Sequence, residues 1–238
     1  MIGVGTGCLL FAADEPRQKV QVTHTERIDF PSGGTLRLRN SIGVLTVEAW
    51  DRPDVEITTI KSTKTEIDAR DREKATHELE EVRVAAERRG DELVITTSFP
   101  RNRVLHPVGG EGNFDLEYRI EAPSTARVVA NHHVGDVNVD GLVGDIQVAL
   151  LEGQILMHLP EEGLYNITAK SDFGQVNSDF PGQQKRRWWL LGHRIVNETS
   201  PATHKLNLRV GYGDIVILKT RIPKPPEPLI PGSKAAGL

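Results

Sequence analysis

The sequence predicts a mainly β protein, a solenoid-like stack of short strands with glycine corners, with one short helix and one β-hairpin. Apolar and polar residues alternate at period two over most of the chain, which is the pattern of strands. Glycine recurs every nine residues in the middle of the chain, at Gly135, Gly144 and Gly153. An aromatic content of 5% favours a thin core of Val, Ile and Leu over a large globular one.

The N-terminal part is expected to begin with strands separated by short turns. Val20 to Phe30 carries spaced apolar residues among polar ones, which predicts an extended edge strand. Pro31 to Gly34 then combine proline, serine and two glycines, a typical turn composition. Residues 36–49 and 55–60 return to period-two alternation, so further strands are expected there.

A helix and a hairpin are expected next. Asp68 to Val84 is rich in charged, helix-forming residues with apolar ones at intervals, which predicts one short helix over residues 69–80. Two alternating segments then flank Gly90-Asp91, which predicts a β-hairpin with its turn at that pair. The tripeptide Arg89-Gly90-Asp91 matches an integrin-binding sequence, but we interpret it as a hairpin tip, where glycine supplies a positive φ.

The glycine repeat indicates strands joined by tight corners. Each unit is one corner plus one short alternating strand, with Val or Ile filling the interior. The tight copies are Val134 to Val139, Val143 to Val148 and Glu152 to Met157, and looser copies are Phe173 to Val176 and Tyr212 to Ile217. The alternative is an ordinary β-meander with glycine turns.

The repeats and their flanks suggest one domain over residues 17–221. It carries an insertion at 181–203, where the repeat pattern is interrupted. Residues 222–238 contain five prolines and no packed pattern, which predicts a Pro-rich disordered tail. Residues 1–16, before the domain, are expected to be the remnant of a signal peptide.

The start of the chain favours export. Ile2 to Ala13 carries no charge and ends abruptly at Asp14, as the end of a signal peptide does. No segment reaches the ~20 apolar residues that a membrane-spanning helix requires. We expect a periplasmic, cell-surface or extracellular location. A lipoprotein anchored through Cys8, the only cysteine, is the alternative.

Three segments together resemble the bacterial putative adhesin domains, also called toast-rack domains, a family of unknown function. The segments are Leu36 to Trp50, Tyr118 to Val148, and Leu206 to Lys219 with Gly213-Asp214 at its centre. The chain departs from the family at Trp188-Trp189, where the family often has a glycine-rich segment. The resemblance implies a β-rich envelope domain that takes part in surface attachment or stress sensing, and it supplies no catalytic residues.

Charge and residue spacing exclude several functions. A net charge of -4 gives no general attraction to nucleic acid. No glycine-flanked serine suits a nucleophile, and the spacing of the eight histidines suits no metal site. His132 and His133 should point to opposite faces of a strand, and the histidines are expected to be solvated or at corners. We therefore expect no cofactor and no enzyme activity.

The best candidate binding patch lies in the insertion and comprises Lys185, Arg186, Arg187, Trp188 and Trp189. Tryptophan faces stack on sugars or insert at membrane interfaces, while the cations meet anionic groups. The alternative is that both tryptophans cover an open end of the stack.

A second candidate is a calcium ladder. Asp136, Asp145 and Asp214 each follow a repeat glycine, and carboxylates aligned along one edge could hold Ca²⁺. Gln154 and Gln175 interrupt this series, however, and an aspartate at a corner usually caps its own turn. The expected metal content is therefore none.

The sequence leaves three functions from different classes. The preferred one is a non-catalytic envelope module that binds cell-wall or surface polysaccharide, or another envelope protein. The alternatives are an envelope-stress sensor domain and a carbohydrate-active enzyme, since such enzymes often use stacked β-structure.

Overall fold

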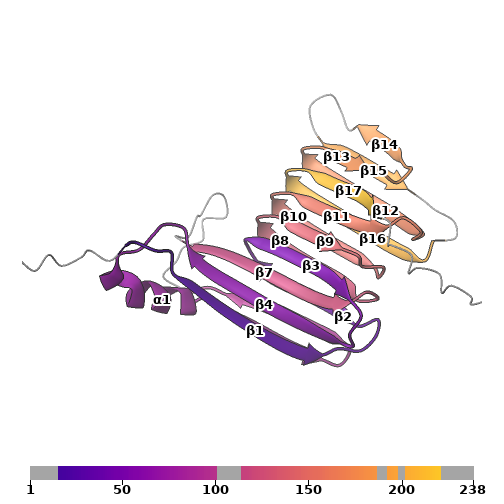
Figure 1. Cartoon of the computed structure of the whole chain (residues 1–238). Helices are drawn as coiled ribbons and strands as arrows, with labels where there is room; N and C mark the ends of the chain where they lie inside the picture. Colours follow the sequence, from indigo (N-terminus) through magenta and orange to yellow (C-terminus); the bar gives the residue numbers. More distant parts are fainter. Residues whose placement is uncertain (1–15, 101–113, 187–191, 198–201, 221–238) are drawn as a thin grey trace, which may run out of the picture.

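The computed structural model describes residues 16–100, 114–186, 192–197 and 202–220, and only the backbone of residues 184–186. About 65% of the described residues are in strands, and one short helix accompanies two large mixed sheets (Figure 1). The predicted fold class is therefore confirmed. No helix within these ranges is long and apolar enough to span a membrane.

The two sheets lie face to face, and the core fills the space between them. In spatial order the eight-stranded sheet contains β1 (Gln21–Asp29), β4 (Asp54–Thr63), β7 (Phe114–Pro123), β3 (Val44–Trp50), β9 (Val137–Asp140), β11 (Ile155–Pro160), β17 (Ile215–Thr220) and β13 (Val176–Ser178). The nine-stranded sheet contains β14 (Gln183–Arg186), β15 (His193–Asn197), β12 (Tyr165–Phe173), β16 (His204–Tyr212), β10 (Ile146–Glu152), β8 (Arg127–Val134), β2 (Thr35–Ser41), β6 (Glu92–Ser98) and β5 (Arg83–Arg89).

The N-terminal elements form as predicted. The edge strand is β1, and the helix is α1 (Arg72–Glu80), preceded by the 3-10 turn η1 (Ala69–Asp71). Leu79 anchors α1 because it is the buried residue of this helix. Strands β5 and β6 form the predicted hairpin, and Gly90 takes a φ of 67° at its tip.

The glycine corners join the sheets. Five units each run from a strand of the nine-stranded sheet, through a glycine, into a strand of the eight-stranded sheet: β2–Gly43–β3, β8–Gly135–β9, β10–Gly153–β11, β12–Gly174–β13 and β16–Gly213–β17. Neighbouring units pair in parallel, whereas a meander is antiparallel, so the meander alternative is wrong. The nine-residue spacing is half a unit, because Gly144 lies on the return turn between β9 and β10.

The units are not stacked in sequence order. Strand β16 lies between β10 and β12, and β17 lies between β11 and β13. The last unit of the described chain therefore fills a position inside the stack and separates two units that precede it (Figure 1).

Register between the units aligns the core into columns. Equivalent inward positions of adjacent units pair directly, and one column in each sheet illustrates this. The columns are Leu36, Val128, Ile146, Leu206 and Ile167 in one sheet, and Leu45, Val137, Ile155, Ile215 and Val176 in the other. Each buried Leu, Ile or Val contributes about 1.5–3 kcal/mol of hydrophobic free energy, so repetition alone builds a substantial core.

Candidate binding surfaces

The structure describes two of the five residues of the predicted patch, and their strand lies at one end of the stack. Lys185 and Arg186 belong to β14, which pairs antiparallel with β15 at the edge of the nine-stranded sheet. Arg187, Trp188 and Trp189 lie outside the described residues. The choice between a binding patch and an end cap therefore stays a prediction.

The three aspartates considered as a candidate calcium ladder do not share one edge. Asp136 and Asp214 follow the corner glycines of β8–β9 and β16–β17, but Asp145 lies on a return turn at the opposite edge. Asp136 and Asp145 are nine residues apart, as are the glycines before them, so the sequence alone does not show that they lie at opposite edges. Within the described ranges, no group of three or more His, Cys, Asp or Glu residues is arranged to hold a metal ion.

Each of these aspartates instead holds a neighbouring segment of main chain. The carboxylate Oδ1 of Asp136 accepts a hydrogen bond from the Gln154 N–H at 3.0 Å, and that of Asp214 accepts one from the Gln175 N–H at 2.7 Å. Asp145 accepts one from the Lys205 N–H at 2.9 Å. Unlike ordinary turn caps, these bonds join the aspartate to a residue distant in the sequence, on a neighbouring part of the stack.

We call the edge formed by the corner glycines the glycine edge. Two rows of side chains flank the glycines along it. In spatial order, the row before the glycines is Ile42, Val134, Glu152, Tyr212 and Phe173, and the row after them is Val44, Asp136, Gln154, Asp214 and Gln175. Main-chain hydrogen bonds link each row from unit to unit, for example from the Gly135 N–H to the Glu152 carbonyl at 2.9 Å. Aspartate and glutamine therefore alternate in space, although the sequence showed the glutamines as interruptions.

Exposed apolar side chains concentrate on the glycine edge. The described chain exposes six large hydrophobic side chains, and four of them belong to the two rows: Val44, Val134, Phe173 and Tyr212. The other two lie elsewhere, Leu151 on the outer face of β10 and Leu164 at the turn between β11 and β12. Isolated exposed hydrophobic residues are normal, but a gathering on one edge marks an interaction surface.

Two of these side chains form an aromatic pair. The rings of Phe173 and Tyr212 stack with centroids 4.7 Å apart and planes inclined by 5°. They pair because β12 and β16 are adjacent and place Phe173 opposite Tyr212. The rings remain 47% and 55% exposed, so they are available to a ligand.

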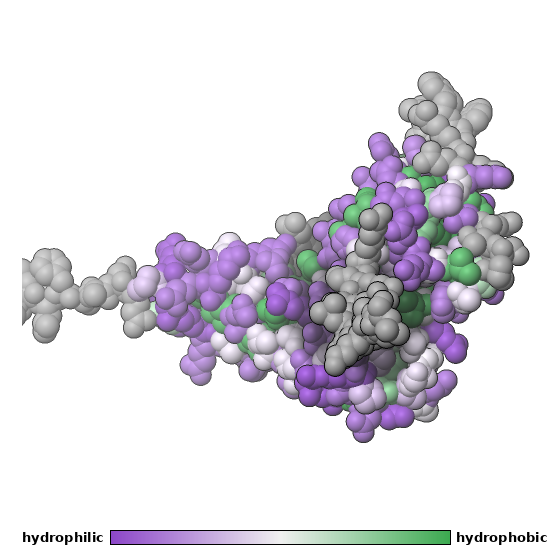
Figure 2. Space-filling model, turned by 45° about the vertical axis from the view of Figure 1, so that its right-hand side comes forward, coloured by the Kyte–Doolittle hydropathy of each residue, from purple (hydrophilic) through white to green (hydrophobic). Residues whose placement is uncertain are grey.

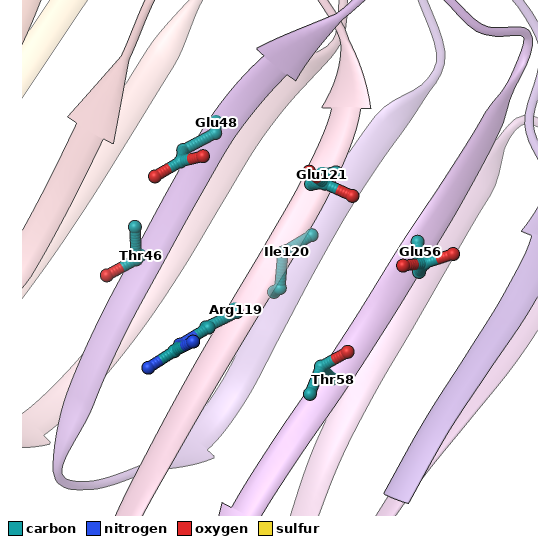
Figure 3. A pocket seen from close by; sticks show the side chains of 7 residues that line it. All are labelled: Thr46, Glu48, Glu56, Thr58, Arg119, Ile120 and Glu121. Atoms are coloured by element: carbon teal, nitrogen blue, oxygen red, sulfur yellow. The ribbon is translucent and has the colours of Figure 1, made fainter.

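The outer face of the eight-stranded sheet carries a shallow hollow of about 460 Å³. Its lining comes from β3, β4 and β7 and consists of Thr46, Glu48, Glu56, Thr58, Arg119, Ile120 and Glu121 (Figure 3). Glu121 lies directly opposite Glu48 on one neighbouring strand and Glu56 on the other. Like charges in directly opposed positions repel one another across a sheet, and the positive charges of Arg27 and Arg119 lie close enough to offset part of this repulsion.

The nearby arginines are already paired. Arg27 bonds Glu56 through its Nε at 3.0 Å, and Arg119 bonds Glu117 through its Nε at 2.6 Å. The bond with Glu117 raises the pKa of Arg119. Surface pairs of this kind are screened by solvent and contribute little stability.

Figure 2 shows a side of the molecule on which hydrophilic residues dominate and apolar ones form small separate areas.

The predicted opposite orientation of His132 and His133 is confirmed. His132 is buried and His133 is exposed. The His132 Nδ1 lies 2.7 Å from the Ser41 Oγ, and its Nε2 lies 2.8 Å from the Gly43 carbonyl oxygen. Burial lowers the pKa of His132 to about 4, so the ring is neutral at pH 7. The Nε2–H therefore donates to Gly43 and Nδ1 accepts from Ser41, a structural role at a corner rather than a ligand site.

No protein-family model matches the chain, and no curated protein matches it. Its fold is similar to that of a putative cell adhesion protein from Clostridium sporogenes, with a TM-score of 0.50 and 13% identity over 84% of this chain and 100% of that chain. Putative adhesins from Bacteroides fragilis and Parabacteroides merdae are more distant. Their TM-scores are 0.30 and 0.24, with 10% and 13% identity over 83% and 67% of this chain and 97% and 69% of theirs.

The Clostridium likeness confirms at the level of fold the adhesin resemblance inferred from the sequence. At 13% identity it speaks for the fold alone.

Proposed function

We propose that this protein is a non-catalytic binding module of a bacterial cell envelope, which attaches to a surface polysaccharide through the glycine edge. The observation that carries the proposal is that four of the six exposed large hydrophobic side chains of the described chain lie on that edge. The uncharged segment Ile2 to Ala13 supports export to the envelope. The adhesin-like fold agrees with a role in attachment.

The chemistry of the edge suits carbohydrate. A sugar ring has apolar C–H faces and a rim of hydroxyl groups, so a matching surface combines aromatic or aliphatic contact with hydrogen-bonding groups. Phe173 and Tyr212 supply the aromatic contact. The row of aspartates and glutamines beside them supplies the hydrogen-bonding groups.

A binding role suits this edge better than a hydrolytic one. A glycosidase needs two carboxyl groups flanking one glycosidic bond, usually in a groove that holds the substrate. Asp136 and Asp214 lie along an outer edge of the stack, two units apart, and each already accepts a main-chain N–H. Their arrangement holds neighbouring units of the stack together.

The test measures binding of the full chain to a panel of cell-wall and capsular polysaccharides by affinity electrophoresis and calorimetry. We expect Phe173→Ala and Tyr212→Ala each to weaken binding at least 10-fold with the fold retained. Leu164→Ala removes a large exposed hydrophobic side chain that lies off the edge, so it is the matched control and should bind normally. Equal binding by all four proteins, or no binding to any polysaccharide, would refute the proposal.

A further inference from the structure

We infer that the glycine edge selects linear polysaccharides without acidic groups and holds them along the axis of the stack, across successive units. This inference rests on the proposed function and specifies the ligand class of the same surface. It is carried by the direction of the two rows, by the hydrogen-bonding groups that remain unused in them, and by their charge.

The direction follows from the topology. Both rows run perpendicular to the strands, because each member belongs to a different unit. Adjacent strands are ~4.8 Å apart, so five units present a strip about 19 Å long. A ligand that follows this strip meets an apolar or aromatic side chain on one side and a carboxylate or amide on the other at three of the five units. An extended chain of sugars has that kind of repeat.

The unused hydrogen-bonding groups suit hydroxyls. Asp136 and Asp214 use Oδ1 to accept an N–H, and among the described residues their Oδ2 atoms have no hydrogen-bond partner. The side-chain amides of Gln154 and Gln175 likewise have no partner within that part of the chain. The row therefore offers acceptors alternating with groups that both donate and accept. Hydroxyl groups, which also do both, can bond every member of this row.

The charge of the strip excludes acidic polymers. The two rows contain the carboxylates Asp136, Glu152 and Asp214 and no lysine or arginine. The nearby cations Lys170 and Arg209 are both paired with Asp172 on the face of the nine-stranded sheet. A polymer bearing carboxylate, sulfate or phosphate groups would bring like charges within a few ångströms of these carboxylates and would be repelled.

The experiment compares two polymers that share a backbone and differ in charge, hydroxyethyl cellulose and carboxymethyl cellulose, at low salt. We expect the full chain to bind the uncharged polymer at least 10-fold more tightly. The double variant Asp136→Asn with Asp214→Asn should raise the affinity for carboxymethyl cellulose about 10-fold relative to the affinity of the same variant for hydroxyethyl cellulose. Asparagine keeps the Oδ1 acceptor for the main-chain N–H, so the stack should survive the change.

Asp145→Asn is the matched control. It makes the same change of charge at an aspartate with the same kind of main-chain bond, but at the opposite edge, and it should leave both affinities unchanged. A parallel series of uncharged cello-oligosaccharides from two to six sugars tests direction. Affinity should rise with each sugar up to about four, the number that the strip can accommodate.

Other outcomes separate this inference from the proposed function. Equal or tighter binding of carboxymethyl cellulose, or an affinity independent of chain length, overturns the inference. Binding that is confined to acidic polysaccharides also overturns the inference. If Tyr212→Ala weakens that binding, the glycine edge is still the binding surface and the proposed function stands. Absence of binding to every polysaccharide defeats both.

Discussion

Gly153 packs against Gly135 so closely that a Cβ atom added to Gly153 would overlap the Gly135 carbonyl oxygen. The contact recurs along the whole glycine edge. A Cβ on Gly135 would meet the carbonyl of Gly43, and one on Gly213 would meet that of Gly153. The corners are thus fixed as glycine by the approach of one unit to the next as well as by backbone conformation.

Gly153→Ala should destabilise the protein by about 3 kcal/mol or more. The substitution adds backbone strain at a φ of 134° to a clash with main-chain atoms that cannot move aside. Gly90→Ala is the control, because Gly90 also has a positive φ, 67°, but open space around its Cβ position, and should cost only about 1 kcal/mol. Urea unfolding measures both. Similar losses in the two variants would show that close packing adds nothing to the requirement for glycine.

His132 should make stability depend on pH. Well above pH 6.5 the imidazole is neutral in both the folded and the unfolded state. As the pH falls towards 4, the unfolded chain binds a proton that the folded chain, with its pKa lowered to about 4 by burial, does not. The free energy of unfolding should therefore decrease by up to about 3 kcal/mol between pH 6.5 and pH 4, because 2.5 pKa units at 1.36 kcal/mol each separate the two states.

His132→Gln should remove most of this slope in urea unfolding measured from pH 7.5 to 4.5. The control is His133→Gln on the exposed side of the same strand, which should keep the slope. A slope that persists in His132→Gln would place the titrating group elsewhere.

Glu121→Gln should stabilise the protein by about 0.5 kcal/mol at low salt. It removes the central member of three directly opposed glutamates on the hollow of the eight-stranded sheet, and the repulsion relieved is of that order. At 1 M salt the gain should vanish, since the Debye length is then about 3 Å. Glu117→Gln, which breaks the bond with Arg119, should give no gain at either ionic strength. A stabilisation that survives high salt would contradict the electrostatic explanation.

Local patterns in the sequence predicted the elements well. Period-two alternation marked the strands, charge-rich helix formers marked α1, and Gly90-Asp91 marked the hairpin turn. The nine-residue spacing of glycines predicted corners, but it could not show that Gly135 and Gly144 lie on opposite edges, because both return the chain after one short strand.

Spatial order is what the sequence could not provide. The stacking of Phe173 on Tyr212 and the alternation of Asp136, Gln154 and Asp214 exist only because β16–β17 lies between two earlier units. Pairing partners so distant along the chain are set by which interior surfaces fit together, and repeated Val and Ile residues fit many partners equally well. The glycine edge was therefore invisible as a surface, although each of its residues stood in a recognised repeat.

The unit β16–β17, which lies between two earlier units of the stack, should stabilise the units on both sides of it. A chain truncated before β16 loses Leu206 and Leu208, which lie between β10 and β12 in the core columns. We expect circular dichroism of such a chain to show a loss of strand signal larger than that of β16 and β17 alone, because β12 and β13 lose the neighbours that bury their apolar faces. Strands β10 and β12 both pair with β16 in the same register. Without β16, therefore, β12 has the register that it needs to pair directly with β10. If the truncated chain unfolds cooperatively and is as stable as the full chain, β12 has paired with β10 and the stack does not need β16–β17.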